Sequence, residues 1–117
     1  MVEAVPGQVV HVSGHLDVAS VPDVRVRLHA ALDAGTGDLL AHLDEAVVAD
    51  ATGLGVLVGA HRRAQRVGRR LVLAGVPLTT WRLLRVTKLH RVLVLADDER
   101  AAQNRRALPS SMPRKAS

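Results

Sequence analysis

Short apolar runs alternate along this chain with stretches of helical periodicity, and this alternation constrains the fold more than any other feature. Runs rich in Val and Leu that end near glycine predict strands over residues 8–13 and 70–74, and the short run RVLVL predicts a last strand over 91–95. The segment 38–48 begins with a continuous apolar run, which is typical of a strand buried on both faces between parallel neighbours. Strands separated by helices predict βαβ units, and therefore an α/β fold whose sheet contains parallel pairs.

The first helix is predicted to begin at Val21. The Ser20 hydroxyl and the Asp23 carboxylate have the spacing of a reciprocal cap, and Pro22 suits the first turn. Gly35 is predicted to end the helix with a positive φ. The apolar residues that recur at helical spacing form the predicted buried stripe: Val21, Val24, Leu28, Ala31 and Leu32.

A second helical pattern starts near Gly53 or Leu54 and stops at Gly68. Its predicted buried stripe consists of Leu54, Leu57, Val58, His61 and Ala64. Its predicted outward positions are Gly55, Val56, Gly59, Arg62, Arg63 and Arg66. Pro77 opens a third helix, and a polar, alanine-rich helix is predicted over 96–107. Residues 108–117 have no periodicity and predict a disordered basic tail.

Composition limits the classes of function that the chain can serve. At 117 residues one domain is expected, and the absence of cysteine excludes disulfides, thiolate metal sites and thiol catalysis. Trp81 is the only residue of the Phe, Trp and Tyr group, which argues against platforms that stack nucleic-acid bases. The net charge of +5 favours binding to a polyanion or to an acidic protein surface. Neither a leader nor an apolar run of about 18 residues is present, so we expect a cytoplasmic protein without a membrane partner.

Residues 49–59, ADATGLGVLVG, permit more than one kind of site. The three glycines are spaced much as in a dinucleotide-binding turn, but the next strand ends LVLAGVP without an acid for a ribose, and no Gly-Lys-Ser/Thr triplet occurs. A second interpretation makes Thr52 the cap of a helix that starts near Gly53 or Leu54. A third makes the Thr52 hydroxyl a phosphate acceptor, favoured by a helix N-terminus and opposed by the charge of Asp50.

The other polar residues predict no catalytic residue, metal site or cofactor. Six histidines are present, but none forms a spaced pair such as His-Glu-x-x-His. Ser13, His15 and Asp17 lie in five residues of one extended segment and would point in different directions, so they do not predict a triad. The arginine-rich second helix lacks helix-turn-helix spacing, and we expect no direct contact with nucleic acid.

Three segments resemble STAS domains of the anti-sigma factor antagonist (anti-anti-sigma factor) family. VVHVSGHLDVASVPDVRVRL resembles the first strand, the Gly-x-Leu-Asp turn and the first helix. VVADATGLGVLVGAHRRAQRVGRRLVLAGV resembles the Asp-Ser-Ser-Gly-Leu-Gly motif with the helix and strand that follow, and LLRVTKLHRVLVL resembles the closing Leu-Leu-x-x-x-Gly-Leu segment. The resemblance implies an α/β fold over residues 1–107, with a mixed sheet of four to five strands and about four helices packed largely on one side.

The resemblance also implies a function and a site. Antagonists of this family bind an anti-sigma factor that is also a serine/threonine kinase, and so free a sigma factor. Phosphorylation prevents this binding, and a protein phosphatase restores it. The acceptor hydroxyl falls on Thr52. The implied docking surface comprises His15, Asp17, Asp50, Ala51, Gly53, Leu54, Gly55, Val56 and Gly59. The chain would be a regulator without enzymatic activity of its own, acting as a monomer or weak dimer.

This chain departs from the family motifs at four positions. Ala51 replaces the first serine, and Thr52 replaces the second with a hydroxyl that carries an extra methyl group. His42 stands where the family usually has an acid, and Lys88 replaces a glycine whose left-handed conformation costs other residues about 1 kcal/mol. Two alternatives stay open: a STAS interaction or scaffold module that does not depend on phosphorylation, and a small nucleotide-binding protein.

Overall fold

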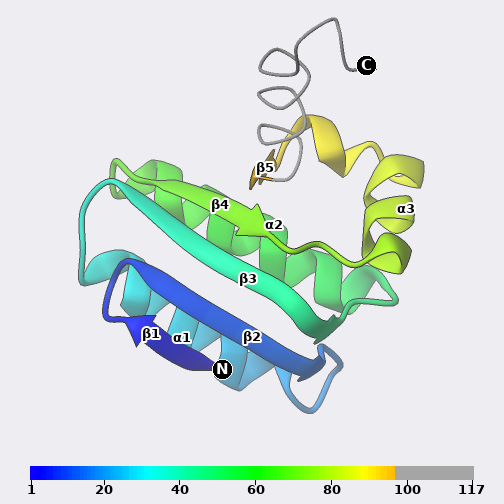
Figure 1. Cartoon of the computed structure of the whole chain (residues 1–117), viewed down its shortest axis with the longest axis horizontal. Coiled ribbons are helices and arrows are strands. Elements are labelled where there is room, and N and C mark those ends of the chain that lie inside the picture. Colours follow the sequence, from blue (N-terminus) through cyan, green and yellow to red (C-terminus); the bar gives the residue numbers. More distant parts are fainter. Residues whose placement is uncertain (97–117) are drawn as a thin grey trace, which may run out of the picture.

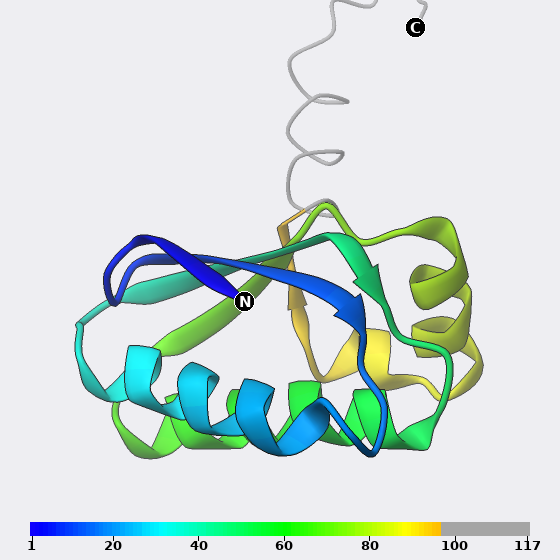
Figure 2. The same cartoon turned by 90° about the horizontal axis from the view of Figure 1, so that it is seen from below.

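The computed structural model describes residues 1–96, which form one layer of sheet and one layer of helices (Figures 1 and 2). In chain order the elements are β1 (Val2–Val5), β2 (Val9–His15), α1 (Val21–Asp33), β3 (Asp38–Val47), α2 (Ala51–Arg66), β4 (Arg70–Ala74), α3 (Leu78–Val86), the 3-10 turn η1 (Leu89–Arg91) and β5 (Val94–Leu95). The helix predicted over 96–107, the tail predicted over 108–117 and the domain end at 107 lie outside the described residues and stay predictions.

The sheet has five strands in the order β1-β2-β3-β4-β5. β1 is antiparallel to β2, and each later strand is parallel to its neighbour. The predicted α/β fold with a mixed sheet is therefore confirmed. About four helices were expected, and residues 1–96 contain three α-helices and one 3-10 turn.

α1 and α2 lie side by side against one face of the sheet, as Figure 2 shows. α3 stands at the end of the sheet toward which β2, β3 and β4 point (Figure 1). Leu, Val and Ala fill the core between sheet and helices. Along β3 the buried residues Leu39, Ala41 and Leu43 alternate with the half-buried Leu40 and His42. The prediction that this strand is buried on both faces is wrong, because helices cover only one of them.

The predicted start and buried stripe of α1 are confirmed, since every residue of the stripe is at most 5% exposed. The predicted cap is wrong. Ser20 has helical backbone angles, and its side chain makes no cap hydrogen bond. Its hydroxyl donates instead to the carbonyl of His15 at 2.6 Å, because the chain before the helix turns back toward the end of β2.

Gly35 does not have the positive φ predicted for it. α1 ends at Asp33, and Ala34 is its C-cap with a φ of −89°. A Cβ on Gly35 would lie 2.5 Å from the carbonyl oxygen of Gly7. The glycine is therefore needed for the close approach of the β1–β2 turn, and not for a left-handed cap.

The later elements follow the prediction except at two boundaries, the starts of α2 and β5. α2 begins at Ala51, before the predicted start, whereas Gly68 follows it with the positive φ of a helix stop. β4 spans the predicted residues, and Pro77 is the N-cap of α3. β5 has two residues where a strand over 91–95 was predicted, because the chain first closes the turn η1 with local bonds such as Val92 N–H to Leu89 C=O at 2.9 Å.

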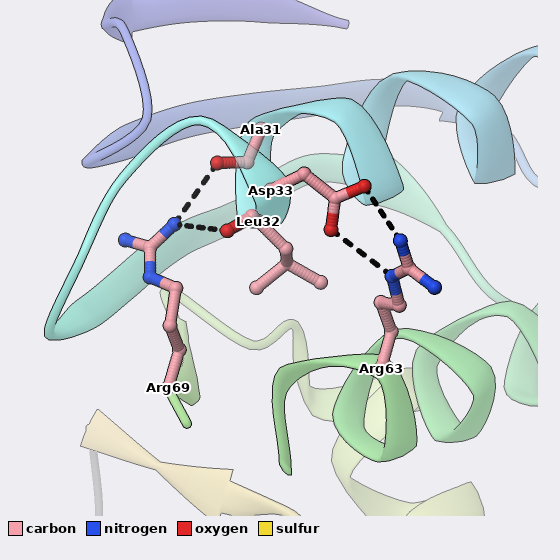
Figure 3. Close-up of polar contacts among 5 residues, drawn as sticks. All are labelled: Ala31, Leu32, Asp33, Arg63 and Arg69. Atoms are coloured by element: carbon pink, nitrogen blue, oxygen red, sulfur yellow. Dashed lines mark hydrogen bonds and ion pairs between the residues drawn. The ribbon is translucent and has the colours of Figure 1, made fainter. Parts of the chain in front are cut away.

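A buried arginine joins segments that are far apart in the sequence. Arg69 is 6% exposed and lies just before β4. Its guanidinium donates to the last carbonyls of α1, on Ala31 and Leu32, both at 2.9 Å (Figure 3). It also donates to the carbonyl of Gly7 at 2.6 Å and to carbonyls of the loop between α1 and β3. The cation therefore satisfies a helix C-terminus, where positive charge is favourable, and fixes the β1–β2 turn beside it.

A surface ion pair links the two long helices near the same end. Arg63 of α2 makes a bidentate contact with Asp33 of α1, at 2.6 and 3.0 Å (Figure 3). The hydrogen bond from Arg63 lowers the pKa of the Asp33 carboxyl. Sequence reasoning placed Arg63 on the outward face of α2, and the half-buried side chain instead spans the gap to α1.

Candidate functional site

Asp50 caps the N-terminus of α2. Its backbone is extended, and its Oδ1 accepts hydrogen bonds from the amides of Thr52 at 2.9 Å and Gly53 at 3.3 Å. The next amide, of Leu54, donates to the Asp50 carbonyl at 3.2 Å. The interpretation of Thr52 as the helix cap is wrong, because the carboxylate of Asp50, two residues earlier, already accepts from the amides that a cap would satisfy.

Thr52 is the second residue of α2 and is half-buried. Within residues 1–96 its hydroxyl makes no hydrogen bond, whereas its backbone is held by Asp50. Ala51 beside it is exposed and offers no competing hydroxyl. The hydroxyl is therefore both fixed in position by the helix and not bonded to the described part of the protein.

The turn after β2 is organised by a second aspartate. Asp17 Oδ1 accepts from the amides of Ala19 and Ser20, both at 3.0 Å. The bond from the Ser20 amide is the main cause of a pKa lowered from the ordinary value of this carboxyl. Asp17 and His15 are both exposed, so a charged carboxylate and an imidazole stand on the surface of this turn.

The turn after β2 and the start of α2 are in direct contact. Because β2 and β3 are parallel neighbours, both strands end at the same edge of the sheet, and Leu16 N–H donates to Val47 C=O at 3.0 Å. A Cβ on Gly53 would lie 2.9 Å from Val48 Cγ1 and 3.2 Å from the Leu16 carbonyl oxygen. The structure therefore brings the Asp17 turn and the Thr52 turn together, and Gly53 makes that approach possible.

The predicted docking surface on α2 is only partly on the surface. Gly55 is exposed and Gly59 half-buried, and a Cβ on either would meet nothing within 4 Å. Val56 is 2% exposed, so its predicted outward position is wrong. Gly53 and Leu54 are also buried. The error has a physical cause: α2 lies in a hollow between the sheet and α1, so its buried face is wider than a single stripe.

The buried face of α2 differs from its predicted stripe at both edges. Leu54, Leu57 and Ala64 are buried as predicted, whereas Val58 and His61 are half-buried. Gly53, Val56 and Ala60 complete the observed face. The exposed Arg62 and Arg66 agree with the outward positions assigned to them.

Two departures from the family motifs have clear structural settings. Lys88 has φ 63° and ψ 14°, so it adopts the left-handed conformation predicted for this position. His42 stacks on His11 with ring centroids 4.5 Å apart, on the sheet face that the helices do not cover. Its Nδ1 lies 3.7 Å from Asp44 Oδ1. The imidazole that replaces an acid is therefore accommodated by a neighbouring ring and a nearby carboxylate.

The described part of the chain contains no group of three or more His, Asp or Glu residues that could hold a metal ion. Among the same residues no helix has the length and apolar character needed to cross a membrane. At the start of α2, the amides that would face a pyrophosphate in a nucleotide-binding turn already bond to Asp50. This occupancy is evidence against the nucleotide-binding alternative.

Comparison with known proteins places this geometry in a family context. A family model described as STAS domain matches residues 1–102. Anti-sigma-B factor antagonists of Staphylococcus aureus, strains NCTC 8325 / PS 47 and COL, are 34% identical over 80 residues, covering 68% of this chain and 74% of each relative.

Two solved structures share the fold. The anti-sigma factor antagonist SpoIIAA in its unphosphorylated form has a TM-score of 0.63 at 22% identity, with 92% of this chain and 96% of that chain covered. The Bacillus cell fate determinant SpoIIAA in the phosphorylated form has a TM-score of 0.59 at 23% identity, with 87% and 95% covered.

Proposed function

Because the chain belongs to the STAS domain family, we propose that it is an anti-sigma factor antagonist whose binding is switched off by phosphorylation of Thr52. In this proposal it binds a kinase-type anti-sigma factor in the cytoplasm and thereby frees a sigma factor. A protein phosphatase restores the active form, and the antagonist acts as a monomer or weak dimer. The names of the Staphylococcus aureus relatives support the general role.

One observation carries the assignment of the switch: the Thr52 hydroxyl stands at the second position of a helix whose N-terminus is fixed by Asp50. The helix holds the acceptor at a defined place, and no hydrogen bond within residues 1–96 has to break before the hydroxyl can attack the γ-phosphorus of ATP. Attack forms the Oγ1–P bond, breaks the bond between the γ-phosphorus and the bridging oxygen, and leaves ADP. The hydroxyl proton passes to a base of the kinase.

The structure also suggests how such a phosphate would act. The amides at the start of α2 already bond to Asp50 or to its carbonyl, so a phosphate on Thr52 could not gain them without displacing the cap. The helix dipole still favours the negative charge, while Asp50 opposes it. The Asp17 turn packs against the same region. The expected effect is therefore a change in surface charge at the docking site, with the fold unchanged.

The test uses the kinase-type anti-sigma factor of the same genome with ATP, and intact mass as the readout. We expect one added phosphate, lost in Thr52→Ala. Thr36 supplies a control, because it is an exposed threonine in the loop that precedes β3, whereas Thr52 follows that strand. Thr36→Ala should be phosphorylated like the parent protein. If Thr52→Ala still takes up phosphate, the assignment of the switch is wrong.

Binding separates the switch from the phosphorylation-independent alternative. Thr52→Ala should still bind the anti-sigma factor, whereas Thr52→Glu should bind at least about tenfold more weakly, since like charges placed at an interface cost affinity. Circular dichroism should show the same fold for both variants. Equal affinity of Thr52→Glu and the parent protein, with no phosphate uptake by the parent, would favour a scaffold module.

A further inference from the structure

A groove with a volume of about 450 Å³ lies between the loop that leads into α2 and the helix α3. We call it the α3 groove; the residues that line it are Val47, Val48, Ala49, Thr79, Arg82, Leu83 and Val86. Most of these are apolar, and Val86 is 81% exposed. Val47, on the other side of the groove, is 41% exposed, so the hollow joins two exposed valines into one apolar patch of the kind that binds a partner.

The part of the chain from the start of α2 to β5 is strongly basic. Residues 51–96 hold nine of the sixteen Lys and Arg residues of the chain and none of its eleven acids. Three of the nine have partners in the structure. Arg63 pairs with Asp33, Arg69 donates to backbone carbonyls, and Arg70 pairs with Asp38 at 2.7 Å.

The cations on α3 and η1 lack such partners. Arg82, Arg85, Lys88 and Arg91 are all exposed, and none of them lies within ion-pair distance of a carboxylate in residues 1–96. Arg85 lies over the ring of Trp81, 5.8 Å from its centroid. The groove therefore combines an apolar floor with the cation of Arg82 in its lining, and neither Arg82 nor the nearby Arg85 has an ion-pair partner in the part of the chain that the structure describes.

We infer that the α3 groove binds an acidic amphipathic helix of the protein partner. This inference deepens the proposed function and rests on it for the identity of that partner, because Val48 and Ala49 of the groove lead directly into Asp50 and the Thr52 turn. Leucine-like side chains would fill the floor, and flanking Glu or Asp would meet Arg82 and Arg85. This is the helix-in-groove mode of recognition, with charge complementarity at the rim.

An apolar floor distinguishes this occupant from a nucleic acid. A phosphate backbone would be attracted to the same arginines, but it would gain nothing from covering Leu83 and Val86. The exposed surface also lacks the aromatic rings on which single-stranded bases stack, since Trp81 is half-buried and packs against Arg85 and His90. The favoured ligand is therefore a protein segment, and nucleic acid is an outcome that the test must separate.

The experiment measures anisotropy of a fluorescein-labelled synthetic peptide of about 18 residues, roughly five helical turns, with leucines along one face and glutamates on both flanks. Comparison ligands are the same peptide with Leu→Ser, the same peptide with Glu→Lys, and a labelled DNA duplex. The expected result is saturable, salt-sensitive binding of the Leu/Glu peptide alone.

Two charge-reversed proteins locate the site. Arg82→Glu/Arg85→Glu should weaken binding about tenfold or more, whereas Arg62→Glu/Arg66→Glu, which changes the net charge equally on exposed positions of α2, should change it less than about twofold. Val86→Asp should also weaken it. Circular dichroism checks that all variants are folded. Equal losses in both double variants, or equal binding of the Leu→Ser peptide or the DNA, would overturn the inference.

The result is separable from the fate of the Thr52 switch. Thr52→Ala should bind the Leu/Glu peptide as the parent protein does, because Thr52 does not line the groove. If Thr52 is phosphorylated by the anti-sigma factor but the peptide does not bind, the groove inference alone fails. If the peptide binds at α3 while no phosphate is taken up, the switch alone fails.

Discussion

Replacing Arg69 with methionine removes a donor that several backbone carbonyls share. Three of its hydrogen bonds, to Gly7, Ala31 and Leu32, are buried. The others reach the more accessible loop between α1 and β3. Methionine keeps most of the apolar stem and loses the guanidinium, so the variant isolates the contribution of the donors.

The structure sets the size of the effect. A buried acceptor left without a donor costs about 1–3 kcal/mol, so three such carbonyls would cost roughly 3–9 kcal/mol. Water can enter from the loop side and replace some of the bonds, and the variant no longer has to bury a charge. We therefore expect a loss of about 3–5 kcal/mol, toward the lower end of that range. This is a large share of the roughly 5–15 kcal/mol that stabilises a domain.

Urea unfolding, followed by Trp81 emission and by circular dichroism, measures this loss. With a typical slope, the midpoint should fall by roughly 2 M. Arg70→Met is the matched control, since Arg70 is the next residue but is exposed, and its surface ion pair with Asp38 is worth about 0–1 kcal/mol. A loss below about 1 kcal/mol for Arg69→Met, or one equal to that of Arg70→Met, would refute the reasoning.

Three further predictions concern stability. Gly55→Ala should stabilise the domain by about 1 kcal/mol because a methyl group there meets nothing, whereas Gly53→Ala should destabilise it by about 1–2 kcal/mol through contact with Val48 and the Leu16 carbonyl. Thermal unfolding of both variants tests these opposite signs, and a higher melting temperature for both would contradict the packing around Gly53. Lys88→Gly should gain about 0.5–1 kcal/mol in urea unfolding by relieving a left-handed backbone, and Lys88→Ala, which keeps a Cβ, should gain nothing. Asp33→Asn should lower the stability at neutral pH but not in acid below the folded pKa of Asp33, because a carboxyl with a lowered folded pKa contributes stability above its unfolded pKa of 3.8 and loses it as the pH falls through the folded value. Urea midpoints of variant and parent that stay apart in strong acid would contradict the ion pair as the cause.

Local patterns in the sequence predicted helices and strands well where buried residues recur at a regular spacing along the chain. The stripe of α1, the span of β4 and the stop at Gly68 required only side-chain spacing and one glycine. The resemblance to STAS domains predicted the mixed sheet and the approach of the Asp17 and Thr52 turns. It did so because the two motifs end parallel strands that are neighbours in the sheet.

The sequence could not predict features that depend on what packs against an element. Val56 is buried although it lies outside the predicted stripe, because α2 packs against both α1 and the sheet, and no spacing along α2 alone reveals two neighbours. Gly35 was assigned a cap conformation when its role is to admit the Gly7 carbonyl. In the sequence Arg69 cannot be told from its exposed neighbour Arg70, because the carbonyls to which Arg69 donates come from distant segments that only the fold brings together. The α3 groove was missed for the same reason, although the absence of acids over 51–96 could have indicated a basic surface.

The strand order has a consequence for synthesis on the ribosome. Because the strands lie in the sheet in the order in which they are translated, each new strand adds to the outer edge of those already made, and none has to be inserted between two paired neighbours. Until β4 emerges, the nascent chain exposes the edge of β3, a ten-residue strand with free backbone groups that could pair with a second nascent chain. In the described part of the chain, the strand on that side of the completed sheet is β5, which is only two residues long and offers little to such a pairing. The hazard of pairing through the edge of β3 therefore lasts until β4 has emerged and paired with it.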